Sequence, residues 1–167
     1  QFAEEEVETS DEPYFMNFPR DMFPIDKHRY LIMTARNEMM QNHPLAAVSL
    51  SEQAAEIASE MNSDYHLAMA IHSIGQSYEF VGNIAEALKY YRKVIKILRE
   101  EVCPGSDVCL SNYLLFTTLF EIGNLTKDTE PKEAIRVLTE KISLLNNKKN
   151  DETYFLENAL LVRAYAK

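Results

Sequence analysis

Apolar side chains recur at helical spacing along this chain from about residue 26 to its end. They return every three or four residues, as they do in an α-helix that buries one face. No stretch alternates apolar and polar residues as a half-buried strand would. The pattern predicts seven helices: about Asp26–Gln41, Leu45–Met61, Tyr65–Val81, Ile84–Glu101, Asp107–Ile122, Pro131–Leu145 and one that begins at Asp151.

Short polar turns separate the predicted helices. Asn42 and His43 end the first helix. Pro44 suits the first turn of the second helix, where an amide proton would have no partner in any case. Ser63 or Asp64 is expected to cap the third helix with its side chain. These signals predict helices joined by short connections.

Glycine marks two predicted helix ends. Gly82 is expected to end the third helix in the left-handed conformation. Gly123 is expected to stop the fifth helix, and a longer loop should follow over residues 125–130. Both glycines therefore predict boundaries.

The predicted helices pair into a repeat. Their openings recur at roughly 40 residues, a period that indicates a solenoid, near His28, Ala68, Cys109 and Glu152. The clearest unit places small and large side chains in a regular order: Ala68, Ile74, Gly75, Tyr78, Gly82, Ala87, Tyr91 and Val94.

This unit resembles the tetratricopeptide repeat (TPR), with Ile74, Gly75, Tyr78 and Gly82 in the order typical of that family. A glycine at such a position lets two helices approach to about 8–10 Å. The long fourth helix and the loop over residues 103–107 are similar to the longer repeats of kinesin light chains. The resemblance implies an all-α fold, a right-handed α-solenoid of antiparallel helix pairs.

The first 26 residues differ from the array. Three prolines interrupt them, which predicts extended backbone because proline disfavours helix in the residue before it. The sequence thus predicts an acidic, aromatic arm over residues 1–26. The helical array over residues 27–167 ends inside a helical pattern, as a truncated array would. The expected anchors, which would hold the arm along the array's groove or across its outer helices, are Tyr14, Phe15, Phe18 and Phe23.

Charge is distributed unevenly along the chain. The net charge is -9, and residues 1–12 hold six acids without a Lys or Arg, which leaves 20 acids against 17 bases elsewhere. A body without positive excess argues against binding to nucleic acid or an anionic membrane. The chain shows neither a membrane-spanning apolar run nor a secretory signal pattern. We therefore expect an intracellular, cytoplasmic protein.

The sequence offers no catalytic or metal site. Cys103 and Cys109 are too far apart for the short spacing of zinc ligands, and we expect two free thiols. His66 and His72 are six residues apart and do not share a helix face. Phosphate-binding loops and nucleophile elbows are absent. We expect no cofactor, no metal and no catalysis.

The family resemblance also implies a binding surface. In TPR arrays the first helix of each repeat lines a concave face that binds an extended peptide or a partner helix. The charged members at these positions should be at the surface, because unpaired charges are rarely buried; we extend this expectation to His72. Carried onto this chain, the groove positions are Arg29, Ile32, Arg36, Met39, Met69, His72, Gln76, Phe80, Tyr113, Thr117 and Phe120.

The expected function is a non-catalytic scaffold that binds another protein, with the N-terminal arm as a built-in inhibitor or a structural cap. Two alternatives stay open. The chain is an accessory helical lobe of a larger enzyme or complex, or it self-associates into a homo-oligomer through its open C-terminal repeat.

Overall fold

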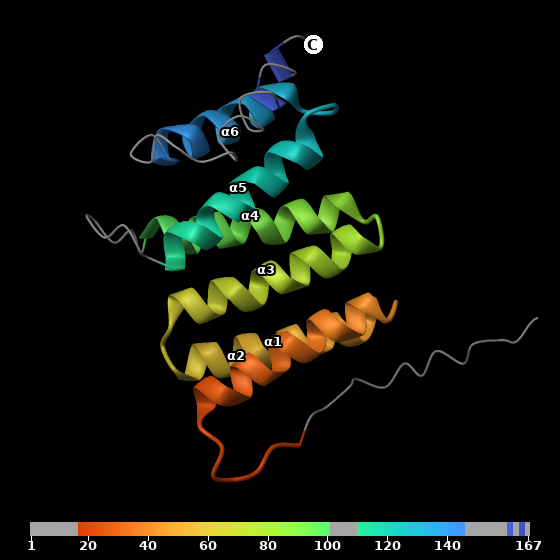
Figure 1. The fold of residues 1–167 in the computed structure, drawn as a ribbon, viewed down its shortest axis with the longest axis vertical. Helices are drawn as coiled ribbons and strands as arrows, with labels where there is room; N and C mark the ends of the chain where they lie inside the picture. Colours follow the sequence, from red (N-terminus) through yellow and green to blue (C-terminus); the bar gives the residue numbers. More distant parts are fainter. Residues whose placement is uncertain (1–16, 101–109, 146–159, 162–163, 166–167) are drawn as a thin grey trace, which may run out of the picture.

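Six α-helices form the body of the protein in the computed structural model (Figure 1). The structure describes residues 17–100, 110–145, 160–161 and 164–165, and no strand occurs among them. Residues 160–161 and 164–165 are helical; the rest of the predicted seventh helix lies outside the described residues. The helices are α1 (Pro24–Met40), α2 (Pro44–Glu60), α3 (Asp64–Phe80), α4 (Ile84–Glu100), α5 (Leu110–Thr126) and α6 (Pro131–Leu145).

Proline opens three of these helices. Pro44 and Pro131 begin α2 and α6 as the sequence predicts. Pro24 begins α1, two residues before the predicted start, and Phe23 before it is extended. Arg20 and Asp21 instead form a turn, in which the Met22 amide donates to the Pro19 carbonyl at 3.2 Å, so the prediction of extended backbone is wrong for this stretch. Proline is tolerated in the first turn because its missing amide proton would have no helical acceptor there.

The predicted end of the fifth helix at Gly123 is wrong. Helix α5 continues to Thr126. Gly123 lies inside it, where a Cβ atom would be only 2.6 Å from Cγ of Leu138 on α6. The absence of a side chain at Gly123 thus allows α6 to pack closely, and the loop before α6 is shorter than predicted.

Helix capping also departs from the prediction. Ser63 occupies the position before α3, yet its side chain makes no capping hydrogen bond. Its Oγ instead lies 2.7 Å from Nδ1 of His66. Among the described residues, Asn83 caps α4 with its side chain: its Oδ1 accepts a hydrogen bond from the amide of Glu86 at 3.3 Å.

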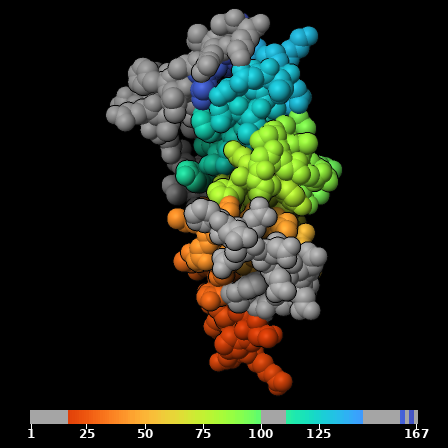
Figure 2. Space-filling view, turned by 90° about the vertical axis from the view of Figure 1, so that its right-hand side faces the viewer, coloured from red at the N-terminus to blue at the C-terminus, as the bar shows by residue number. Residues whose placement is uncertain are grey.

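The six helices form antiparallel hairpins that follow one another along the long axis of the molecule (Figures 1 and 2). Helix α1 packs against α3, and α3 packs against α5. The outer helices α4 and α6 instead meet through long arginine and glutamate side chains. A stack whose first helices lie closer together than its second helices curves toward the first. Helices α1, α3 and α5 therefore line the inner face of this α-solenoid.

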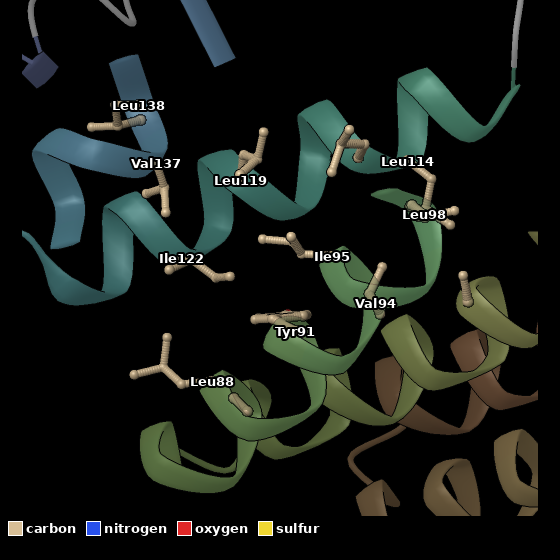
Figure 3. Close-up of a cluster of buried hydrophobic side chains, with 13 residues drawn as sticks. Leu88, Tyr91, Val94, Ile95, Leu98, Leu114, Leu119, Ile122, Val137 and Leu138 are labelled. Atoms are coloured by element: carbon tan, nitrogen blue, oxygen red, sulfur yellow. The ribbon is translucent and has the colours of Figure 1, made fainter. Parts of the chain in front are cut away.

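Two clusters of buried apolar side chains hold the stack together. The first core lies between α1 and α2 and includes Ala70 of α3. The second core joins α3, α4, α5 and α6 around the fully buried Tyr91 (Figure 3). Helix α3 contributes to both cores and so connects the two parts of the array.

Gly75 brings α3 and α4 together as the sequence predicts. A Cβ atom at this position would lie 2.7 Å from Cε1 of Tyr91. The tyrosine ring therefore occupies the space beside the glycine, and its burial depends on that small residue. Separately, none of the described helices is both long enough and apolar enough to cross a membrane.

Candidate protein-interaction groove

The inner face carries corresponding side chains on successive first helices. Arg29, Arg36 and Met40 follow one another at intervals of seven and four residues on α1, and all three are exposed. Residues separated in this way lie on one face of a helix. Helix α3, which begins 40 residues after α1, repeats the same spacing at Met69, Gln76 and Phe80.

The inner-face side chains of α1 differ in chemistry from those of α3. On α1, Arg29 and Arg36 have no ion-pair partner among the described residues, so their charge is available to a ligand. On α3, Met69 and Gln76 are half-buried, and Phe80 leaves 51% of its surface exposed. The inner face is therefore positively charged on α1, whereas on α3 it carries apolar and amide side chains.

Helix α5 continues this face. Tyr113 is 73% exposed, and Thr117 is half-buried with its hydroxyl donated to the Tyr113 carbonyl. Phe120 is half-buried against the second core, and Nζ of Lys141 on α6 lies 4.6 Å from the centre of its ring. Phe120 thus contributes mainly to packing, while Tyr113 presents a large free aromatic surface.

A polar cluster joins α3 to α5. His72 Nε2 lies 2.6 Å from Oε2 of Glu121, and the amide of Gln76 donates to the other oxygen of that carboxylate at 3.4 Å. His72 is only 7% exposed, so the expectation that it lies at the surface is wrong. Because the Glu121 carboxylate accepts a hydrogen bond from its ring, His72 is satisfied inside the structure and joins α3 to α5.

Tyr91 of α4 extends this cluster from below. Its hydroxyl donates to the Glu79 carboxylate at 2.6 Å, and its ring centre lies 5.3 Å from that of His72. Burial, the nearby Glu121 charge and the hydrogen bond to Glu79 all raise the pKa of Tyr91. The phenol therefore stays protonated and holds Glu79 in place.

Several predicted groove positions belong chiefly to the cores. Ile32 and Met39 are partly buried against the first core, and Met69 against the second. Their apolar side chains fill space between helices, as the alternative interpretation of these positions allowed. The surface that is left for a ligand is narrower than the predicted set and is carried mainly by Arg29, Arg36, Gln76, Phe80, Tyr113 and Thr117.

The described end of the arm packs on the first repeat. Phe18 is partly buried against the first core, and its ring stands edge-on to Tyr30 with 5.9 Å between centres. Phe23 is 71% exposed and does not anchor the arm. Tyr14 and Phe15 lie outside the described residues.

Sequence reasoning missed the histidine contact between α1 and α3. His28 is fully buried, and its Nε2 lies 3.0 Å from the backbone oxygen of His66. The two rings are 4.9 Å apart and nearly perpendicular. No sequence pattern marks this contact, because the acceptor is a backbone carbonyl, which every residue possesses.

Comparison with known proteins finds similarity only among solved structures. No family model matches the chain, and no curated protein matches it. A crystal structure described as Podosopora anserina putative kinesin light chain nearly identical TPR-like repeats is similar at a TM-score of 0.45 and 15% identity, covering 86% of this chain and 87% of that one. A variant of the same repeats gives a TM-score of 0.47, also at 15% identity, over 87% and 88%.

Proposed function

We propose that this chain is a non-catalytic scaffold that binds an extended peptide or a helix of another protein along its inner face. The observation that carries the proposal is the corresponding set of positions on α1 and α3, exposed on α1 and exposed or half-buried on α3, continued by the exposed Tyr113 on α5. A groove built on rigid helices loses little entropy when a ligand binds, since its side chains are already positioned.

The chemistry of the groove favours a particular kind of ligand. The two unpaired arginines on α1 suit carboxylates, because guanidinium donors pair with both oxygens. Phe80 and Tyr113 offer aromatic contact, and the Gln76 amide suits backbone groups. The expected ligand therefore carries acidic residues at one end and apolar residues at the other.

The packing of Phe18 supports a capping role for the described end of the arm. The start of a repeat array exposes an apolar face that needs a cover. Phe18 covers part of the first core beside Tyr30. In this proposal residues 17–23 stabilise the first repeat and leave the groove open.

Peptides selected from a random display library against the full chain provide the test. We expect Arg36→Glu and Tyr113→Ala each to weaken binding of the selected peptides about tenfold or more, as loss of a central interface contact does. Arg136→Glu serves as the charge-matched control, because Arg136 lies on the outer side, on α6. Peptides that bind all three variants equally, or a chain that selects no peptide, would contradict the groove and favour an accessory lobe or self-association.

A further inference from the structure

Helix α4 presents basic side chains on its outer face. Lys89, Arg92, Lys93, Lys96 and Arg99 follow one another at intervals of one or three residues, and all five are exposed. The opposite face of α4 is buried in the second core. We call this set of five residues, together with Arg136 on α6, the basic ridge.

Two arginines of the basic ridge bind glutamates on α6. Arg92 Nε and Nη2 donate to the Glu133 carboxylate at 3.3 and 2.5 Å. Arg99 pairs with Glu140 in the same two-pronged way, at 3.1 and 2.5 Å. Each pair leaves the second terminal nitrogen of its guanidinium, Nη1, for a further acceptor.

A hollow of about 370 Å³ lies between these pairs. The buried side chains Ile95 and Ile122 contribute apolar walls. Four cations and one acid complete its lining: Arg92, Lys96, Arg99, Arg136 and Glu133. An apolar base surrounded by excess positive charge suits a carboxylate-rich peptide that also carries an apolar side chain.

Positive charge stays in excess after the neighbouring glutamates are counted. Arg136 lies 3.6 Å from Glu133 and 3.9 Å from Glu140, at the limit of an ion pair. Lys96 has no ion-pair partner among the described side chains, and Lys93 lies over the ring of Tyr90 at 4.9 Å. Both ammonium groups are thus available to a ligand. Polyanions such as nucleic acids are disfavoured by the glutamates within the ridge and by the net charge of -9.

The chain itself contains a matching segment. Residues 1–12 hold six acids, no Lys or Arg, and the apolar residues Phe2 and Val7. Eight residues lie between Glu8 and Asn17, where the described structure begins, and an extended chain over these nine steps spans about 30 Å. Neighbouring helices lie about 8–10 Å apart, so this length crosses about three helix widths.

From this charge complementarity we propose that the acidic N-terminal segment, residues 1–12, docks on the basic ridge of its own chain between α4 and α6. The segment thereby occupies the outer side of the array and leaves the inner groove to a partner. This inference is independent of the groove proposal, since it concerns other helices and other residues.

Zero-length carbodiimide cross-linking of the full chain, followed by peptide mass spectrometry, tests the inference. Carbodiimide joins a carboxylate to an amine only when the two are in contact. We expect links from the acids of residues 4–12 to Lys93 and Lys96, at a yield about fivefold above links to Lys27 on α1 or Lys127 after α5. About 0.5 M salt should suppress them, because it screens exposed charges.

Two matched variants separate this result from the groove. Arg136→Glu should lower the yield at Lys96 about fivefold by adding repulsion, whereas Arg36→Glu in the groove should leave it unchanged. A mixture of isotopically labelled and unlabelled chains distinguishes links within one chain from links between two. Links directed to Lys27, equal yields at all lysines, or links formed chiefly between chains would each overturn the proposal.

Discussion

At the scale of single residues, three left-handed residues stand at intervals of 20 along the chain. Asn42, Asn62 and Gly82 have φ values of 66°, 50° and 76°. Each lies second in a three-residue turn. Asparagine and glycine are the residues that adopt this conformation most readily. Their spacing gives α1 to α4 the same length and sets the 40-residue repeat.

A second residue-scale feature is the close approach of hairpin partners. Gly75 faces Tyr91, and Gly123 faces Leu138. In the first hairpin the corresponding positions, 40 residues before Gly75 and Tyr91, hold Ala35 and Ser51, both buried. A large residue on the second helix is thus matched by glycine on the first, and a small residue by alanine. In each hairpin a larger side chain on one helix is thus compensated by a smaller one on the other, as close packing requires.

Gly75→Ala should destabilise the protein. The added Cβ would lie 2.7 Å from Cε1 of Tyr91, and overpacking of this kind costs about 1–3 kcal/mol, against a gain of about 1 kcal/mol in helix propensity. We expect a net loss in the free energy of unfolding, measured with urea. Gly82→Asn is the control: it should be nearly neutral, because asparagine occupies the same turn position at residues 42 and 62. An unchanged or increased stability of Gly75→Ala would refute close contact with Tyr91.

At the scale of elements, histidines join successive first helices. His28 of α1 contacts the His66 backbone of α3, and His72 of α3 contacts Glu121 of α5. Since a carbonyl only accepts, His28 carries its proton on Nε2. Its buried Nδ1 has no hydrogen-bond partner among the described residues. A second proton on that ring would therefore be a buried charge without an acceptor.

Burial lowers the pKa of His28, and the facing His66 and Arg29 lower it further, against the opposing effect of the His66 carbonyl. Burial and Arg29 also lower the pKa of His66. Tyr65 and Ser63 complete the surroundings of the pair. A histidine with a lowered pKa binds fewer protons folded than unfolded. Its contribution to stability is therefore fully present above the unfolded value of about 6.5 and is lost as the pH falls toward the folded value.

We expect the free energy of unfolding to fall between about pH 7 and pH 5.5, within the range where unfolded histidine takes up its proton. His28→Gln, which preserves a donor near the His66 carbonyl, should flatten part of this dependence. The matched control is His43→Gln, since His43 is exposed. Carboxylates contribute equally to the pH dependence of both variants, so the difference between the variants reports the histidine alone. Equal pH dependence in wild type and His28→Gln would rule out the α1–α3 contact as an acid-sensitive joint.

At the scale of the whole molecule, the array consists of two cores connected by α3. The first core holds α1 and α2, and the second holds α4, α5 and α6. Besides apolar packing, a hydroxyl pair links α2 to α3, where Ser51 donates to Ser73 at 2.8 Å. In stacked repeats, each unit contacts only its neighbours, and stability is a sum of local terms. The first hairpin is therefore expected to open separately from the rest.

Hydrogen exchange on two core variants tests this division. Leu50 of α2 and Leu98 of α4 are both buried, at 0% and 1% exposure. Either Leu→Ala change should cost about 2–5 kcal/mol locally. We expect Leu50→Ala to lower amide protection in α1 and α2 while α4 keeps most of its protection, and Leu98→Ala to lower it in α3 to α5. Uniform loss across all helices in both variants would indicate a single cooperative unit.

The sequence by itself determined the helices, their turns and their pairing. Local chemistry carries this information: the 3.6-residue period, proline in the first turn, and asparagine or glycine at left-handed positions act within a few residues. Gly75 also reported its close packing correctly. The prediction that Gly123 ends a helix was wrong, because the sequence alone does not distinguish a glycine that ends a helix from one that allows close contact with a partner helix.

Only the tertiary structure decided which inner-face residues are free. His72 was predicted to lie at the surface, but it is buried because it contacts Glu121, which is 49 positions away in the sequence. His28 and the ridge between α4 and α6 likewise depend on partners brought together by stacking. Burial and ion pairing depend on which segments, distant in the sequence, pack against each other. A periodic pattern specifies the face of a helix that packs, but the neighbouring helices decide which of its polar side chains are satisfied and which stay available to a partner.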